Sequence, residues 1–441
     1  MRRMLKALVI LAAWLVTLHV MARPARIAAQ APAAAQAPAS AAQDDPIRTI
    51  VGRLDLEKYK ATIKGLTQFG DRRQGTDRNR AANDWIEAQL KSYGCSDVAR
   101  IKYEYAPAPR TTTAGAAGRG EAAAAAAGGR GGAAAAAAGR GAAGTQAAAQ
   151  GQGRRGAAPV KGNRGPTGVN NDPQKQPDAK LRALDMQPTT PGPREEVYCT
   201  KVGTTHPEEM YIVSGHMDGL GYSEAANDNA SGTALVLELA RIFSAPDVQT
   251  DRSIRFVLWN NEETGLQGAG AYAEQRGPLQ GKEDPPGSGK YPEPKWLGVI
   301  AHDMMTFDHG MPGPDGKVAP EQRAEADVNI EFAGTSKMAP LAQELAWAFK
   351  AANDRYATDY PAVVGNRMSN TDSRAFQDLA PSISLREAER QSQVGAGWDP
   401  HWHQPTDVFA TFSDKDFRLG LNAAQTTLAA VAQLTGARLK Q

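Results

Sequence analysis

Apolar residues along the chain follow two different periods, and the two periods alternate. Short stretches of clustered or alternating apolar residues predict strands over 98–105, 196–202, 210–216, 253–259, 296–304, 328–333 and 382–385. Longer stretches with apolar residues three or four positions apart predict helices over 44–69, 79–93, 229–243, 266–274, 336–353 and 414–439. Strands that alternate with helices are typical of an α/β fold. We therefore expect a single domain with a largely parallel, mixed central sheet flanked by helices.

The first 43 residues follow neither period. Residues 1–6 are basic, residues 7–22 are mostly apolar, and small residues follow, which is the pattern of a secretory signal peptide. We expect a signal peptide over 1–30, an Ala/Pro-rich linker over 31–46, and an exported protein. The alternative is an uncleaved membrane anchor, although the apolar run is short for a spanning helix, which needs about 20 residues.

A second stretch without either period begins near Pro107 and ends near Pro193. It consists of poly-Ala runs, Gly-Arg-Gly units and scattered prolines. Glycine recurs too often for a stable helix, and the stretch cannot bury a core. We therefore expect a disordered low-complexity insertion in a domain that spans 47–441. The arginines resemble RNA-binding segments, but no aromatic residues lie between them, so we expect a basic spacer and no nucleic-acid partner.

Composition narrows the class of protein further. The chain is 41% hydrophobic with a formal net charge of +2, which excludes a wholly disordered chain and a collagen and gives no global reason to bind nucleic acid. The two cysteines, Cys95 and Cys199, lie too far apart in sequence for a zinc thiolate site, which uses close pairs. In an exported protein they favour one disulfide over two buried thiols.

Polar side chains gather where the predicted strands end. His216 ends the strand 210–216 and Asp218 follows it, Glu262 and Glu263 follow 253–259, Asp303 lies near the end of 296–304, Asp228 precedes the helix 229–243, and His403 precedes the last helix. In open parallel sheets, sites form at the carboxyl ends of the strands, so these side chains should converge. Carboxylates with imidazoles are the ligands of zinc or a similar divalent metal.

Each of these residues alone has an ordinary explanation. Asp228 could cap its helix, and Glu262 with Glu263 could be solvated loop charge. His216 could be a core histidine, and His403 could pack among tryptophans. Their joint placement at the ends of separate strands favours a metal site over four unrelated roles.

The motifs around these residues resemble a known family. The chain contains, in order, Ser214-Gly215-His216-Met217-Asp218, Asn227-Asp228-Asn229-Ala230-Ser231-Gly232, Asn261-Glu262-Glu263-Thr264-Gly265-Leu266, His302-Asp303-Met304 and Trp402-His403-Gln404-Pro405-Thr406-Asp407. This order is similar to that of the M28 metallopeptidases, which are co-catalytic zinc aminopeptidases and their relatives. The resemblance covers nearly all of residues 50–441 outside the insertion and implies a zinc exopeptidase-like fold.

The resemblance also implies a role for each residue and a cofactor of two Zn²⁺ ions. His216 and Asp303 would bind one zinc, Glu263 and His403 the other, and Asp228 would bridge them, with a cis peptide bond after it. Asp218 would hold His216 in its ligating tautomer. Glu262 would be the general base that passes a proton to the leaving amine.

Two departures from the family pattern bear on substrate preference. The chain reads Thr371-Asp372-Ser373 where many relatives read Ser-Asp-His, and His302 precedes Asp303 where an apolar residue is usual. The segments 277–294 and 310–325 are also unusually rich in proline and glycine.

The function that we expect is an exported zinc aminopeptidase acting on peptides. Two alternatives use the same fold: a glutaminyl cyclase-like acyltransferase, which needs one zinc, and a carboxypeptidase. A non-catalytic binding protein on a decayed peptidase scaffold should lack a ligand, and none is missing. We expect a peptide substrate as partner and no stable membrane partner once the signal is cleaved; the sequence does not predict the oligomeric state.

Overall fold

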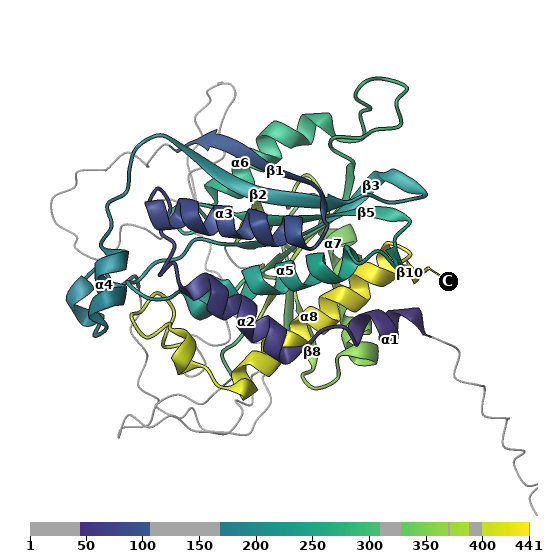
Figure 1. Cartoon of the computed structure of the whole chain (residues 1–441). Coiled ribbons are helices and arrows are strands. Elements are labelled where there is room, and N and C mark those ends of the chain that lie inside the picture. Colours follow the sequence, from purple (N-terminus) through teal and green to yellow (C-terminus); the bar gives the residue numbers. More distant parts are fainter. Residues whose placement is uncertain (1–44, 106–167, 309–327, 369–370, 388–398, 441) are drawn as a thin grey trace, which may run out of the picture. The chain divides into compact units, whose positions relative to one another are not determined.

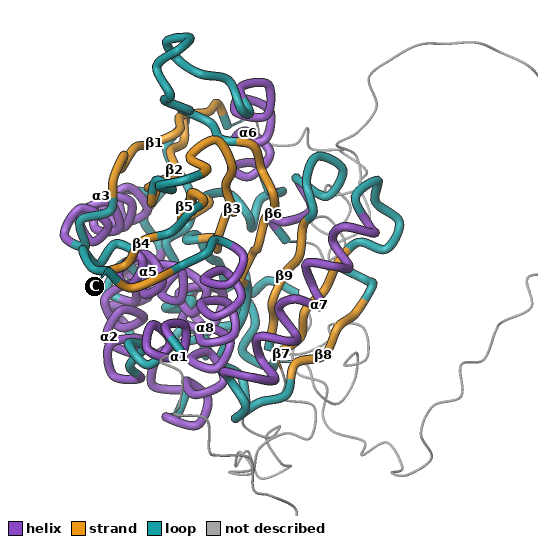
Figure 2. Tube along the Cα trace, turned by 90° about the vertical axis from the view of Figure 1, so that its right-hand side faces the viewer, coloured by secondary structure: helices purple, strands orange, loops and turns teal. Residues whose placement is uncertain are grey.

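An eight-stranded mixed sheet runs through the computed structural model of the chain (Figures 1 and 2). Its order is β1 (Ser96–Glu104), β2 (Pro193–Lys201), β5 (Arg252–Trp259), β3 (His206–His216), β6 (Lys295–His302), β9 (Ser382–Arg386), β7 (Val328–Phe332) and β8 (Ala362–Gly365). The central strands β5, β3, β6 and β9 are parallel to one another, whereas β1, β2 and β7 introduce the antiparallel pairs. The predicted mixed sheet with a parallel centre is confirmed.

The structure describes residues 45–105, 168–308, 328–368, 371–387 and 399–440. The predicted signal peptide 1–30 and nearly all of the linker 31–46 lie outside these ranges. The linker prediction extends too far, because Asp45 caps a helix that begins at Pro46. Among the described residues, no helix combines the length and the apolar character that crossing a bilayer requires.

Helices cover both faces of the sheet and enclose two hydrophobic clusters. They are α1 (Pro46–Val51), α2 (Leu56–Thr67), α3 (Asp77–Ser92), α5 (Gly232–Phe243), α6 (Gln267–Arg276), α7 (Ala339–Tyr356) and α8 (Asp414–Leu434). The larger cluster contains residues from α1, α2, α3, α5, α7 and α8, and the smaller one contains residues from α6. Figure 2 shows α2, α5 and α8 on one side of the strands and α6 on the other. α5 is buried along almost its whole length, including the predicted stripe Leu235, Leu239 and Ile242, so it forms the centre of the larger cluster.

Two predicted helices are shorter than the apolar pattern indicated. The helix predicted over 44–69 is two helices, because Gly52 ends α1 and the Asp55 side chain accepts a hydrogen bond from the Lys58 amide at the start of α2. The helix predicted over 414–439 ends at Leu434. Gly436 then adopts a left-handed conformation (φ 65°), and β10 (Arg438–Leu439) pairs with β4 (Val248–Gln249).

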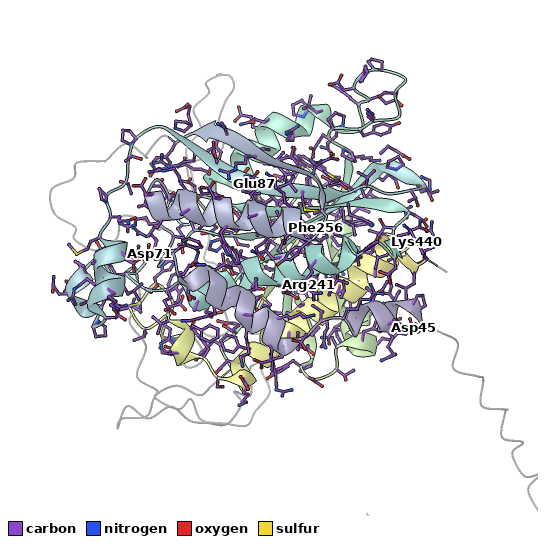
Figure 3. All side chains as sticks on the ribbon, in the orientation of Figure 1. Asp45, Asp71, Glu87, Arg241, Phe256 and Lys440 are labelled. Atoms are coloured by element: carbon purple, nitrogen blue, oxygen red, sulfur yellow. A yellow bond between two sulfur atoms is a disulfide. The ribbon has the colours of Figure 1, made fainter. Side chains whose placement is uncertain are left out.

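The last part of the low-complexity insertion is regular structure, contrary to the prediction. Residues 106–167 lie outside the described residues, but residues 168–192 contain a 3-10 turn (Pro173–Lys175) and helix α4 (Ala179–Asp185). The buried Asp185 carboxylate accepts a hydrogen bond from the Asp71 amide, and Arg78 lies 3.5 Å from it. Figure 3 labels Asp71 beside α4. Composition alone misplaced this boundary, because a few buried polar contacts, among them those of Asp185 and Gln176, anchor the segment.

A disulfide joins Cys95, in the turn after α3, to Cys199 in β2. The Cα atoms are 6.0 Å apart, which is within the usual range for a bridge. The predicted bridge is therefore confirmed over the alternative of two buried thiols.

The Pro/Gly-rich segment 277–294 lies away from the carboxyl ends of the central strands. It connects α6 to the start of β6, and its base is fixed by buried Glu293, which accepts hydrogen bonds from Arg255, the Tyr272 hydroxyl and the Trp296 ring. The segment therefore does not shape a site at the carboxyl ends, so this departure from the family pattern does not bear on substrate preference there. The second such segment, 310–325, lies outside the described residues.

Candidate metal centre

The seven residues singled out in the sequence meet at the carboxyl ends of β3, β5 and β6. His216 is the last residue of β3, and Asp303 directly follows β6. Glu262 and Glu263 follow β5, Asp228 lies in the turn before α5, and His403 lies in the loop before α8. The convergence follows from the parallel register, in which His216 pairs with Trp259 and Gly215 pairs with His302.

The ligand-type side chains form two groups that share Asp228. His216 Nε2 lies 3.4 Å from Asp228 Oδ1 and 3.5 Å from Asp303 Oδ1. His403 Nε2 lies 3.1 Å from Asp228 Oδ2 and 2.8 Å from Glu263 Oε2. Each oxygen of one carboxylate thus faces a different imidazole. The ligand atoms within each group lie within 4.8 Å of one another, the spacing at which one cation could bind to all three.

The backbone around Asp228 directs its carboxylate into the site. The peptide bond between Asp228 and Asn229 is cis, as the resemblance implied. The Asp407 carboxylate accepts hydrogen bonds from the Asn227 amide at 2.7 Å and the Asp228 amide at 3.0 Å. The Asn229 side chain accepts from the Gly232 amide at 2.9 Å, so Asn229 and not Asp228 caps the first turn of α5. The alternative interpretation of Asp228 as a helix cap is wrong.

His216 is held through the ring nitrogen that faces away from the site. Its Nδ1 lies 3.0 Å from the Asp218 carbonyl and 3.7 Å from the Asp218 carboxylate. A hydrogen bond from Nδ1 to this carbonyl leaves Nε2 free to bind a metal. The Asp218 carboxylate instead accepts a hydrogen bond from the Glu262 amide at 3.1 Å. Asp218 therefore holds His216 by its main chain and the Glu262 loop by its side chain, a division that the sequence did not indicate.

His403 is positioned differently. Its Nδ1 is buried and has no hydrogen-bond partner among the described residues. Its ring stacks on that of Trp402 with the centroids 4.2 Å apart, and its backbone adopts a left-handed conformation (φ 57°). The side of this imidazole that faces away from the carboxylates is therefore positioned by ring stacking and by the backbone.

The cluster of carboxylates perturbs the pKa of its members in both directions. Burial, followed by the nearby carboxylate of Asp228, raises the pKa of Glu263 to about 7, and burial with neighbouring Glu263 and Asp303 raises that of Glu262 well above its ordinary value. Burial also opposes ionisation of Asp303, but Arg386 and His216 lower its pKa to about 2. Crowded carboxylates of this kind compete for protons unless cations neutralise them.

The residues present fit a divalent metal such as zinc. The donor set consists of imidazole nitrogens and carboxylate oxygens, which zinc binds in proteins. In addition, Glu263 Oε1 is buried without a hydrogen-bond partner among the described residues. A lone pair of this oxygen is thus unused in the group that contains Asp228, Glu263 and His403. A metal ion would satisfy that atom and neutralise the carboxylates.

Arg386 and Arg72 contribute to the site but were not foreseen. Arg386, the last residue of β9, lies with a guanidinium nitrogen 2.5 Å from Asp303 Oδ2. Buried Arg72 donates hydrogen bonds to the carbonyls of Met217, Glu224 and Ala225 and so holds the loop between Asp218 and Asp228. The sequence could have indicated Arg386, because it is a charged residue at the end of a predicted strand, as several of the predicted ligands are. No sequence pattern marks Arg72.

The two departures from the family pattern have different consequences. His302 points away from the site, with Nδ1 2.9 Å from the Ser214 carbonyl and Nε2 2.8 Å from the Thr427 hydroxyl, so it belongs to the core. Asp372 is buried, and its carboxylate has no hydrogen-bond partner among the described residues. Burial, then the nearby carboxylates of Asp218 and Asp303, raise the pKa of Asp372 well above its ordinary value. This acid therefore lies close to the candidate metal centre.

Known proteins match the region that contains the site. The sequence profile of Peptidase family M28 matches residues 196–427. Aminopeptidase YwaD from Bacillus subtilis is 33% identical over 118 residues, which are 26% of this chain and 24% of that protein. Carboxypeptidase Q from Xenopus laevis is 36% identical over 73 residues, which are 17% of this chain and 16% of that protein. The chain thus spans about a quarter or less of the length of these relatives.

The fold is similar to that of solved aminopeptidase structures. BSAP, a zinc aminopeptidase from Bacillus subtilis, superposes with a TM-score of 0.54 at 15% identity, covering 86% of this chain and 95% of that chain. At this identity the likeness concerns the fold, a large mixed sheet flanked by helices.

Proposed function

The chain belongs to peptidase family M28, and from this premise we propose that it is an exported aminopeptidase that uses two zinc ions. The single observation that supports the two-metal site most directly is the shared Asp228, whose two oxygens face His216 and His403 separately. His216, Asp228 and Asp303 would hold one ion, and Asp228, Glu263 and His403 the other. Bound zinc would supply a water of lowered pKa and polarise the scissile carbonyl.

Glu262 is the residue that we assign to proton transfer. It lies in the loop after β5, and its amide is fixed by the Asp218 carboxylate. Its carboxylate lies close enough to His216 and Glu263 to form a third possible group with them, but it belongs to neither of the two groups that share Asp228. A buried carboxylate beside the two groups can take a proton from the attacking water and then give it to the leaving amine. The neighbouring Glu263 faces His403, so adjacent residues would have separate tasks.

The choice of the amino end of the substrate is supported by the relatives that are aminopeptidases. The match to a carboxypeptidase keeps the opposite end as the alternative, because the metal centre does not determine which end of the peptide is bound. Glutaminyl cyclase-like chemistry would require only one zinc ion.

Export is supported by two independent features. The basic and then apolar residues 1–22 form a secretory pattern, and the Cys95–Cys199 disulfide is a bond that persists in oxidising compartments.

One sample can test these assignments together. We expect purified, zinc-replete protein to contain two zinc ions per chain and to release the chromophore from amino-acid anilides with a free α-amine. Matched N-acetylated anilides should not be cleaved. One zinc per chain would favour the cyclase, and cleavage of N-blocked peptides from their carboxyl end would favour the carboxypeptidase.

A further inference from the structure

The first described residues of the predicted insertion connect two loops of the candidate metal centre. Residues 168–176, which we call the bridging segment, lie between the loop that follows Asp218 and the loop that contains His403. Gln176 is 2% exposed, and its side-chain amide donates hydrogen bonds to the Tyr222 carbonyl at 2.8 Å and the Pro405 carbonyl at 3.0 Å. One side chain thus joins both loops.

Asn170 makes the contact closest to a predicted ligand. Its backbone amide donates to the His403 carbonyl at 3.0 Å, and its side chain donates to the Gly221 carbonyl at 3.1 Å. The Gln404 side chain donates in turn to the Gly168 carbonyl at 2.8 Å. The bridging segment therefore holds the backbone of His403 and the side chain of its neighbour.

The bridging segment is itself anchored at its far end. Arg182 of α4 donates to the Gln176 carbonyl at 2.6 Å, and the Asp178 amide donates to Gln176 Oε1 at 3.0 Å. α4 then ends at Asp185, which is paired with Arg78 and the Asp71 amide. In Figure 1, α4 and the yellow stretch before α8 lie on the same side of the molecule. The segment is thus a fixed connection between the body of the protein and the His403 loop.

The two predicted histidine ligands differ in what orients them. His216 has a hydrogen bond on Nδ1, the usual way in which a metal-binding imidazole is fixed. His403 Nδ1 has no such partner among the described residues, so its backbone and its stacking on Trp402 orient the ring together with the contacts of Nε2 to Asp228 and Glu263. The bridging segment supplies hydrogen bonds to the backbone of His403 and to that of Pro405, two residues further on.

We propose that the bridging segment is a positioning element for His403, with Gln176 and Asn170 as its positioning residues. This inference rests on the proposed metal function. It predicts that weakening the segment reduces the affinity of the group that contains Glu263 and His403, while the group that contains His216 and Asp303 keeps its affinity. The end of the low-complexity insertion would then help to position a ligand of the metal ion that Glu263 and His403 hold.

The test is a calorimetric zinc titration of metal-free full-length protein. We expect Gln176→Ala to raise one of the two zinc dissociation constants by about 10–100-fold, as loss of a supporting contact around a metal ligand typically does, and to leave the other within about threefold. Gln174→Ala is the matched control, because Gln174 is the same residue type two positions away and is exposed. Activity of Gln176→Ala should return when zinc is added in excess.

A second variant distinguishes positioning of His403 from a general contribution to stability. Asn170→Ala, which removes the side-chain bond to the Gly221 carbonyl and keeps the backbone bond to His403, should give a smaller loss at the same site and serves if Gln176→Ala does not fold. Equal weakening of both dissociation constants, with a lowered melting temperature, would mean a merely structural role and would overturn the proposal, as would unchanged binding in both variants. If wild-type protein bound fewer than two zinc ions, the proposed function would fail instead, which is a different result.

Discussion

Asp228 shows how the site depends on the placement of single side chains. Its carboxylate is useful as a bridge only because Asp407 fixes the two amides before the cis bond and Asn229 takes over the capping of α5. The sequence motif identified Asp228 and also contained Asp407, but only the structure shows that the two cooperate. The sequence could not show that one residue positions another, since such roles depend on contacts between segments about 180 positions apart.

The neighbouring acids Glu262 and Glu263 should separate proton transfer from metal binding. We expect Glu262→Gln to lower kcat by about 10²–10⁴-fold, the usual contribution of a general base, while zinc content stays near that of the wild type. Glu263→Gln should lose zinc as well as activity, because Glu263 Oε2 lies beside His403. Kinetics and metal analysis of the same preparations provide the measurement, and equal zinc loss in both variants would contradict the division.

His302 should make the protein sensitive to acid. Burial lowers its pKa to about 4 from an ordinary value of 6.5, so it stays neutral in the fold while the unfolded chain takes up a proton. The stability that it contributes is present above pH 6.5 and is lost as the pH falls toward 4. Between about pH 7.5 and pH 5 this loss amounts to about 2 kcal/mol. Urea unfolding of metal-free His302→Gln should show a shallower loss over this range, and parallel curves for the two proteins would refute the prediction.

At the scale of elements, periodicity located the helices and strands better than it located their ends. The apolar stripe of α5 and the buried strands β3 and β5 were predictable because packing against one core dictates their pattern. The break between α1 and α2 was missed because Gly52 and Asp55 act through local caps that leave the apolar spacing intact. The two-residue strands β4 and β10 are too short to carry any period.

Two deletions of different length should separate the spacer from the anchored segment. Replacing residues 111–163 with a short Gly/Ser loop should leave the free energy of unfolding nearly unchanged, because their Ala- and Gly-rich composition cannot supply a core. Extending the deletion to Pro191 removes Asp185 and leaves buried Arg78 with one acidic partner fewer, which should cost about 3 kcal/mol or more. Denaturant unfolding of both variants makes the comparison, and equal stability would show that α4 packs without consequence.

At the scale of the whole molecule, the fold class and the position of the site were predictable together. A parallel centre brings strand ends to one edge, so ordered motifs after β3, β5 and β6 imply convergence before any coordinate is known. The bridging segment was missed for a different reason: residues 168–192 contain aspartates and leucines that the Ala- and Gly-rich residues before them lack, but they are too short and too rich in proline to show a helix or strand period. Its order comes from a few buried polar contacts, such as those of Gln176, that leave no pattern in the sequence.

The stability of the whole protein should couple to metal and pH in a defined direction. In the metal-free protein, burial raises the pKa of Glu263 to about 7. Burial alone would lower the pKa of His403, but nearby Glu263 and Asp228 outweigh it and raise this pKa to about 10. Protons therefore stabilise this form, and the stabilisation is lost as the pH rises through about 7 for Glu263 and toward 10 for His403. Zinc requires the deprotonated ligands, so its contribution grows with pH over the same interval.

We therefore expect the gap in melting temperature between zinc-loaded and metal-free protein to widen from about pH 5.5 to pH 8. At a thousandfold excess of zinc over the Kd of a site, binding at that site adds about 4 kcal/mol, or roughly 5–10 °C for a domain of this size. His302 destabilises the zinc-loaded and the metal-free protein equally in acid, so its effect cancels in the difference between their melting temperatures. Thermal unfolding at each pH, once with zinc and once with a chelator, therefore measures the contribution of the metal centre. Asp303→Asn with Glu263→Gln, which removes a carboxylate from each group, should abolish the gap at every pH. A gap that stayed constant in the wild type would mean that the carboxylates at the strand ends do not exchange protons for metal.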